Sequence, residues 1–228
     1  MIYAVSDLHG CFEKYEALMD HLKLSDKDTL YVLGDIVDRG DGGIRIILDL
    51  LSRKNVVCLR GNHDHTAFLC LSHLADAKDG LDSDRLMEAF RLWLSDGGAP
   101  TLNSFIELDE TEQQRVLNFL NSLPYYKEIN VRGKRFFLAH TVPGKEEMIH
   151  SGRRLLHDYL IGEPEYEKVY YDDVTIVTGH IPTGFIDPHY TGRIWKGNNH
   201  VAIDCGAVFG NPLGCICLDT MEEIYVGE

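Results

Sequence analysis

Acidic residues follow one short apolar segment at intervals of three. The segment "YVLGDIVDRGDGG", residues 31–43, passes from an apolar stretch into Asp35, Asp38 and Asp41, with Arg39 among them. Like charges repel, and a buried carboxylate is costly unless it is paired or bound to a metal. The cluster is therefore either a solvated turn or one part of a site whose counter-charge comes from elsewhere.

Four other apolar segments end in polar residues that can bind metal. The segment "IYAVS" is followed by Asp7 and His9, "VVCLRG" by Asn62 and His63, "FFLA" by His140, and "TIVTG" by His180. Ligands of layered α/β sheets bind beyond the carboxyl ends of the strands. We therefore expect these side chains to meet Asp35 at one edge of the fold. A single Asp-x-His turn or a lone histidine is commonly structural, so the joint pattern carries the prediction.

The donor types indicate which metals would suit this site. Carboxylate, amide and imidazole donors fit borderline divalent ions such as manganese, iron or zinc. Six protein ligands are too many for one catalytic ion with an open position, but they suit two ions about 3.5–4 Å apart that share a bridging carboxylate. Asp35 is the expected bridge, because it lies centrally in the linear order. The predicted metal ligands are Asp7, His9, Asp35, Asn62, His140 and His180.

Alternating patterns of strand and helix must position these residues. In the first half, apolar strand patterns at 2–6, 29–34 and 55–61 alternate with helical patterns at 11–22, 43–53 and 65–77. Helical patterns at 82–98 and 109–124 follow, then a hairpin at 126–140 and strands at 174–180, 200–209, 213–219 and 222–228. We expect the last three strands to be neighbours. The pattern predicts one α/β (α+β) domain over 1–228, with two packed sheets and helices outside.

Composition excludes several classes of protein. The net charge of −14 argues against non-specific nucleic-acid binding, and thus against a phosphodiesterase that acts on nucleic acid. The six cysteines form no CxxC pair, which predicts buried free thiols in a reducing compartment. The start lacks a signal peptide's features, and no run of about 18 apolar residues suggests a membrane span. We expect a cytoplasmic protein, monomeric by default, whose helical middle (65–123) shapes access to the site.

Three segments resemble the motifs of a known family. "SDLHG" (6–10), "GDIVDRG" (34–40) and "RGNHD" (60–64) resemble those of the phosphoprotein phosphatase family within the calcineurin-like metallophosphoesterases. The chain length and "IDCGAVFG" (203–210) resemble the bacteriophage-lambda-type protein phosphatases of bacteria and phages. The resemblance implies a four-layer fold, a central β-sandwich of two mixed sheets flanked by helices. It also implies two divalent metal ions, with manganese expected and iron or zinc as alternatives.

The resemblance also assigns roles to the motif residues. Asp7, His9 and Asp35 would hold one metal, and Asp35, Asn62, His140 and His180 the other. The implied reaction is hydrolysis of a phosphate monoester by direct attack of metal-bound water.

The same resemblance gives roles to residues that do not bind metal. His63 would protonate the leaving oxygen and Asp38 would orient His63, which suits an alkoxide that needs a proton. Arg39 and Arg60 would grip phosphate oxygens, since a guanidinium binds two such oxygens at once. A salt bridge to the acidic cluster is the alternative role for either arginine.

Some positions depart from the family pattern. The first motif begins with Ser6 where glycine is usual, and the third ends in Asp64 where protein phosphatases usually have glutamate. Symmetrical diadenosine-tetraphosphate hydrolases often have aspartate there. Members commonly carry a further phosphate-gripping arginine between the two late histidines. Arg153 and Arg154 lie in that interval, but the local sequence matches poorly, so neither is assigned.

Three functions follow from this pattern. We favour a phosphatase acting on phosphoserine and phosphothreonine in proteins, and phosphotyrosine is a further candidate substrate. The alternative is a dinucleoside-polyphosphate (diadenosine tetraphosphate) hydrolase with the same metals. A non-catalytic module that keeps a metal for structure is the third, and the complete ligand set argues against it.

Overall fold

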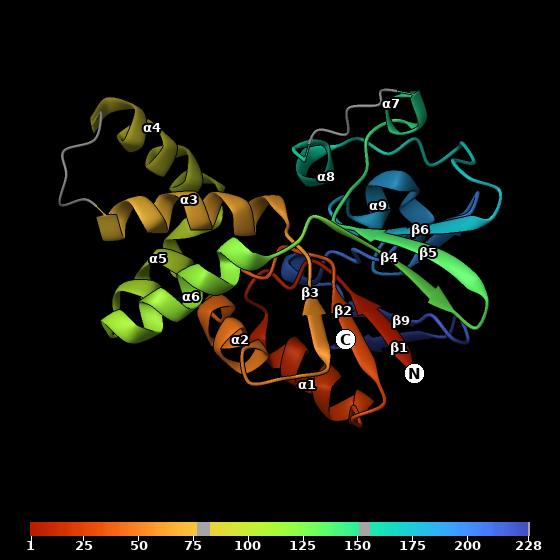
Figure 1. Ribbon diagram of the computed structural model, residues 1–228, viewed down its shortest axis with the longest axis horizontal. Helices are drawn as coiled ribbons and strands as arrows, with labels where there is room; N and C mark the ends of the chain where they lie inside the picture. The colour runs from red at the N-terminus through yellow and green to blue at the C-terminus, as the bar shows by residue number, and fades with distance from the viewer. Residues whose placement is uncertain (77–82, 151–155, 228) are drawn as a thin grey trace.

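The strands of this protein form two sheets that pack face to face. The computed structural model describes residues 1–76, 83–150 and 156–227. One five-stranded sheet has the order β10-β9-β1-β2-β3 and the other β4-β5-β6-β8-β7 (Figure 1). The first contains β1 (Ile2–Val5), β2 (Thr29–Val32), β3 (Val56–Cys58), β9 (Leu213–Cys217) and β10 (Glu223–Val226). The second contains β4 (Tyr126–Val131), β5 (Lys134–Ala139), β6 (Val174–Thr178), β7 (Trp195–Gly197) and β8 (His200–Ala202).

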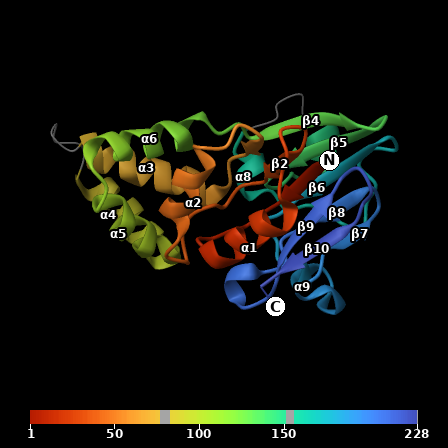
Figure 2. The same cartoon turned by 90° about the horizontal axis from the view of Figure 1, so that it is seen from below.

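Helices cover the outer faces of both sheets. Figure 2 shows α1 and α2 beside the first sheet, with α3, α4, α5 and α6 gathered at one end of the molecule. Their bounds are α1 (Phe12–Leu22), α2 (Gly43–Leu50), α3 (Asn62–Asp76), α4 (Ser83–Trp93), α5 (Ala99–Ile106) and α6 (Glu110–Ser122). The short helices α7 (Lys145–His150), α8 (Asp158–Ile161) and α9 (Thr183–Ile186) lie near the second sheet. The predicted four-layer α/β sandwich is confirmed.

Alternating side chains in the strands create separate cores. On β1, Tyr3 and Val5 join the core beneath the helices, whereas Ala4 points between the sheets. On β2, Leu30 and Val32 face the helices, whereas Tyr31 joins the core between the sheets. Successive strand side chains point to opposite faces, so a strand covered on both faces must be apolar throughout. This explains the continuous apolar runs in the sequence.

Parallel pairing brings the polar ends of the strands together. β1, β2 and β3 are parallel neighbours, and β5 and β6 are parallel in the second sheet. The residues that follow these five strands therefore emerge in the same direction within each sheet. The site is built at this edge.

Two expected element positions are wrong. The strand from His200 to Ala202 does not neighbour β9, because it pairs with β6 and β7 in the other sheet. The third helix begins at Asn62 rather than His65, because His65 N–H already donates to the carbonyl of Gly61. This first turn places Asn62 and His63 at the helix N-terminus.

The prediction of free, mostly buried thiols is confirmed. All six cysteines are free thiols, five of them are buried and Cys11 is half-buried. Along the described parts of the chain, none of the helices is both long and apolar enough for a membrane span.

Candidate active site

Unusual backbone conformations turn the polar side chains inward at the strand ends. Asp7, His9, Asp35, Asp38 and His180 all have positive φ angles, between 40° and 70°. This region is uncommon for residues other than glycine, and such strain is concentrated at functional sites. Backbone hydrogen bonds stabilise it, since His9 N–H donates to Asp35 O at 2.8 Å.

Two glycines make room for the acids. A Cβ atom at Gly61 would lie 2.1 Å from Asp35 Oδ1, and one at Gly179 would lie 2.0 Å from Asp7 Oδ2. Any larger residue would displace these carboxylates. The glycines in "RGNHD" and "TGH" are therefore explained by close approach.

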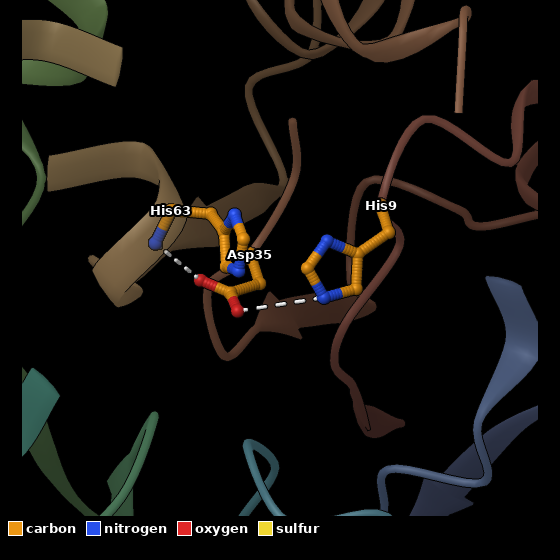
Figure 3. Close-up of side chains that lie close together, drawn as sticks. All are labelled: His9, Asp35 and His63. Carbon is orange, nitrogen blue, oxygen red and sulfur yellow. Dashed lines mark hydrogen bonds and ion pairs between the residues drawn. The ribbon is translucent and has the colours of Figure 1, made fainter. Parts of the chain in front are cut away.

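Asp35 lies at the centre of the site. Its Oδ2 is 3.5 Å from His9 Nε2 and 3.4 Å from His140 Nε2, and its Oδ1 accepts a 2.9 Å bond from the His63 N–H. Figure 3 shows Asp35 between His9 and His63. One carboxylate thus faces histidines from both sheets, which is the arrangement that a bridging ligand needs.

The other predicted ligands surround this carboxylate. His140 Nε2 lies 2.9 Å from Asn62 Oδ1 and 3.1 Å from His180 Nδ1. Asp7 Oδ1 is 4.0 Å from His9 Nε2, and its Oδ2 accepts a bond from the His180 N–H. All six predicted ligands therefore meet in one cluster that has Asp35 at its centre.

The histidine rings are oriented for metal binding. His9 Nδ1 lies 3.1 Å from Val37 O, and His140 Nδ1 lies 2.9 Å from Leu33 O. A donor N–H on Nδ1 leaves the lone pair on Nε2, the atom that faces Asp35. Burial lowers the pKa of His9, and it lowers that of His140 to about 3. Both rings are therefore neutral at physiological pH, as metal ligands must be.

The buried carboxylates require positive charge. Burial, with a contribution from the charge of Asp35, raises the pKa of Asp7, and burial also raises the pKa of Asp35. Divalent cations would supply the missing counter-charge. The mixed oxygen and nitrogen donors fit two such ions, one near Asp7 and His9 and the other near Asn62, His140 and His180.

A buried pair beside the cluster is suited to proton transfer. His63 Nδ1 lies 2.9 Å from Asp38 Oδ2, and both side chains are almost fully buried. Burial alone would lower the pKa of His63, but the hydrogen bond to Asp38 and the charges of Asp35 and Asp38 outweigh it and raise that pKa to about 9. His63 is thus protonated at neutral pH and can act as a general acid.

We predict that the metal-free protein loses stability as pH rises from 6.5 to 9. Folding raises the pKa of His63 from 6.5 to about 9. Its contribution to the free energy of unfolding is therefore complete below pH 6.5 and is lost as the pH rises through 9. The raised pKa of Asp7 acts in the same direction, because its buried carboxyl ionises as pH rises. Thermal unfolding in chelator across this range is the measurement. Saturating Mn²⁺ should reduce the fall in melting temperature across this range. A melting temperature that rises with pH would contradict the prediction.

Two residues from the helical middle hold Asp38, and the sequence did not single them out. The buried Trp93 donates from Nε1 to Asp38 Oδ2 at 2.9 Å. The Thr101 hydroxyl donates to Asp38 Oδ1 at 2.7 Å and accepts from the Asp38 N–H. Between them lies a π-helical segment, Leu94–Gly98, with Gly97 at φ 102°. The adjacent glycines at 97 and 98 were the available signal for this turn.

We expect Trp93→Phe to lower kcat while changing KM little. The phenyl ring fills much of the same space but cannot donate to Asp38, so His63 is held less firmly. A net hydrogen bond is worth about 0.5–1.5 kcal/mol, which corresponds to a decrease of about 2–13-fold. Steady-state kinetics across pH would measure the effect, and Trp195→Phe is the matched control. An unchanged kcat and pH profile would show that Trp93 only packs.

The two predicted phosphate-gripping arginines lie in different surroundings. Arg39 is exposed at the rim, where its Nη1 lies 2.8 Å from His9 Nε2 and its Nη2 lies 3.0 Å from His63 Nε2. Arg60 is buried and donates to the carbonyls of Leu120, Asn121 and Leu123 at the end of α6. Arg39 is therefore placed to meet a phosphate, whereas Arg60 secures α6, and phosphate binding by Arg60 stays a prediction.

Two further acids contribute to the site in different ways. Asp64 accepts from the N–H groups of Asp35, Ile36 and Gly61, so it fixes the loop that carries the central carboxylate. Asp96 lies at the rim, 3.8 Å from Arg39 Nη2. Its negative charge opposes an incoming anion at the same place.

Arg153 and Arg154, which lie between the two late histidines, fall outside the described residues.

Relatives in sequence include nucleotide hydrolases. Symmetrical bis(5'-nucleosyl)-tetraphosphatase of Pseudomonas syringae pv. syringae (strain B728a) is 40% identical over 65 residues, which are 28% of this chain and 22% of that protein. The enzyme of the same name from Buchnera aphidicola subsp. Schizaphis graminum (strain Sg) is 33% identical over 90 residues, 39% of this chain and 33% of that protein. The matched stretches thus span about a fifth to a third of these relatives.

Solved structures and a family model cover far more of the chain. A putative diadenosine tetraphosphatase superposes with a TM-score of 0.67 and 18% identity, covering 99% of this chain and 92% of that one. A protein serine/threonine phosphatase from Saccharomyces cerevisiae gives 0.62 and 15%, covering 99% and 78%. At these identities the likeness concerns the fold alone. The model of the calcineurin-like phosphoesterases matches residues 1–210, and the chain therefore belongs to that family.

Proposed function

We propose that this protein hydrolyses dinucleoside tetraphosphates at a centre of two divalent metal ions, splitting diadenosine tetraphosphate into two molecules of ADP. The observation that carries the proposal is the convergence of the other five predicted ligands around Asp35, directly beside the His63–Asp38 pair. The names of the relatives in sequence support the choice of substrate.

Three side chains of this protein would have separate roles in the reaction. When bound, the two ions activate water and neutralise charge on the phosphoryl oxygens. Arg39 would hold the non-bridging oxygens of the attacked phosphate, since its guanidinium lies at the rim between His9 and His63. Water adds to phosphorus, the bond to the bridging oxygen breaks, and His63 gives its proton to the departing ADP. Asp38 would keep the ring aimed at that oxygen and stabilise its charge.

Hydrolysis of phosphoserine and phosphothreonine in proteins is the competing function. The same centre would serve, because only the leaving group differs. The relatives in sequence favour the dinucleotide over the phosphoprotein. Manganese is the proposed metal in either case, from the mixed carboxylate and imidazole donors.

A parallel turnover assay tests the proposal. Protein stripped with chelator and reloaded with Mn²⁺ would receive diadenosine tetraphosphate, a phosphoserine peptide and a phosphotyrosine peptide at equal concentrations. We expect the dinucleotide to be cleaved fastest and ADP to be the only nucleotide product, with no turnover by Asp35→Asn. Faster release of phosphate from either peptide would overturn the proposal and support a protein phosphatase. Equal amounts of AMP and ATP would contradict the symmetrical cleavage.

A further inference from the structure

An apolar cavity of about 300 Å³ lies among the segments that follow β6 and β8, and it has no role in the chemistry described above. Its walls come from α9 and from the short helix η4 (Ala207–Phe209). Pro182 lies two residues after the ligand His180, and Gly206 follows the strand β8. One wall of the cavity therefore follows the end of β6, the strand that delivers His180 to the site.

Two exposed aromatic rings stand at this cavity. Phe185 on α9 is 83% exposed and Phe209 on η4 is 63% exposed. Large apolar side chains gathered around a hollow indicate a binding surface. The guanidinium carbon of Arg39 lies 5.5 Å from the centre of the Phe209 ring. A ligand in the cavity would thus be continuous with a phosphate held by Arg39.

The loop that carries Phe209 is tethered at both ends. A Cβ atom at Gly206, which has φ +77°, would lie 2.9 Å from Asn211 Nδ2. Lys14 Nζ donates to the carbonyls of Ala207 and Asn211, which fixes both ends of the loop. The ring of Phe209 is therefore presented from a tethered segment.

The chemistry of the lining selects a flat, neutral ligand. None of the described residues that line the cavity carries a charge, which disfavours a phosphate or a peptide ammonium group there. The side-chain amide of Asn211 has no hydrogen-bond partner among the described residues, although its backbone is bonded on both sides. A free amide can donate and accept at once, which is the pairing that asparagine makes with N7 and the N6 amino group of adenine. Aromatic rings stack on any base through its π-face.

We infer that this cavity binds one adenine of the dinucleotide, with Phe185 and Phe209 stacking on the base and Asn211 contacting its edge. The inference rests on the proposed function. The ribose and phosphate chain would then lead past Arg39 towards Asp35. Such a subsite would make the enzyme prefer a nucleotide over a phosphate ester that lacks a base.

Kinetics with and without a base test the inference. The Mn²⁺-loaded full chain would be given diadenosine tetraphosphate or p-nitrophenyl phosphate. The readout is the kcat/KM value for the dinucleotide divided by the kcat/KM value for p-nitrophenyl phosphate. We expect Phe209→Ala and Phe185→Ala each to lower this ratio by at least about fivefold, because stacking on one base is worth about 1–3 kcal/mol. Asn211→Ala should lower the ratio for the adenine compound more than for its diuridine counterpart. Ile106→Ala, which removes an exposed side chain from α5, is the control.

Adenosine binding separates this inference from the proposed function. Adenosine lacks phosphate, so saturation-transfer NMR would report on the cavity independently of turnover. If Phe209→Ala or Phe185→Ala abolishes adenosine binding at an unchanged melting temperature, adenine binding in the cavity is supported even if the dinucleotide is not cleaved. Cleavage of the dinucleotide with an unchanged kcat/KM ratio in both phenylalanine variants would overturn adenine binding in the cavity. It would not affect the proposed function. Failure of the wild-type chain to bind adenosine would also overturn it.

Discussion

Replacement of Asp35 by asparagine should abolish metal-dependent hydrolysis. The Oδ2 atom of Asp35 lies 3.5 Å from His9 Nε2 and 3.4 Å from His140 Nε2, so its charge would serve both proposed metal positions. An amide is neutral and bridges two cations poorly. Loss of an outer-shell partner already costs about 10–100-fold in metal affinity or activity, so we expect a decrease of more than about 100-fold for this central ligand. Turnover in Mn²⁺ and calorimetric titration of the chelator-treated protein are the measurements.

The same acidic run offers a matched control for this substitution. Asp41 is exposed and lies outside the ligand cluster, so Asp41→Asn should keep its activity and two bound ions. We expect Asp35→Asn to bind fewer than two ions while keeping its fold, because its side chain can still accept from the His63 N–H. Two tightly bound ions and normal turnover in Asp35→Asn would contradict the bridging role.

Replacement of His63 by asparagine should lower kcat while metal binding is kept. His63 follows the predicted ligand Asn62, and its Nδ1 is hydrogen-bonded to Asp38, so we assign its ring to proton transfer rather than to metal binding. Loss of a general acid costs about 10²–10⁴-fold when the leaving group needs a proton. The expected decrease is largest for an alkyl phosphate and smallest for p-nitrophenyl phosphate, whose leaving oxygen is stable as an anion.

The dependence on the leaving group distinguishes proton transfer from a structural defect. A variant that misfolds or loses metal would slow all substrates equally. His73→Asn changes a histidine near the other end of α3 and should leave the rates unaltered. The general-acid role is disproved if His63→Asn slows the alkyl and the p-nitrophenyl esters by the same factor. Asp38→Asn should reproduce the His63→Asn pattern in weaker form, because the ring remains but is no longer oriented or charged.

Local sequence was sufficient to predict the layered fold and the placement of the ligand types. Apolar runs of four to six residues ending in Asp7, Asp35 or His140 predict buried strands, and polar residues beyond buried strands face the edge of a sheet. Helical spacing predicted α1, α2 and α6. These features depend on residues close together in the chain, so their periodicity and end signals are visible without coordinates.

Contacts between distant segments were decided only by the tertiary structure. Trp93 lies 55 residues from Asp38, and no local period connects an indole N–H to that carboxylate. Arg60 has a motif position that implies phosphate binding, yet its guanidinium meets carbonyls about 60 residues away at the end of α6. The pairing of β8 with β6 rather than β9 is also non-local.

The sequence by itself determined which residue types could do the chemistry, because strand ends are local features. Packing between the layers decided which partners orient those residues, because that choice depends on the shape of the whole chain.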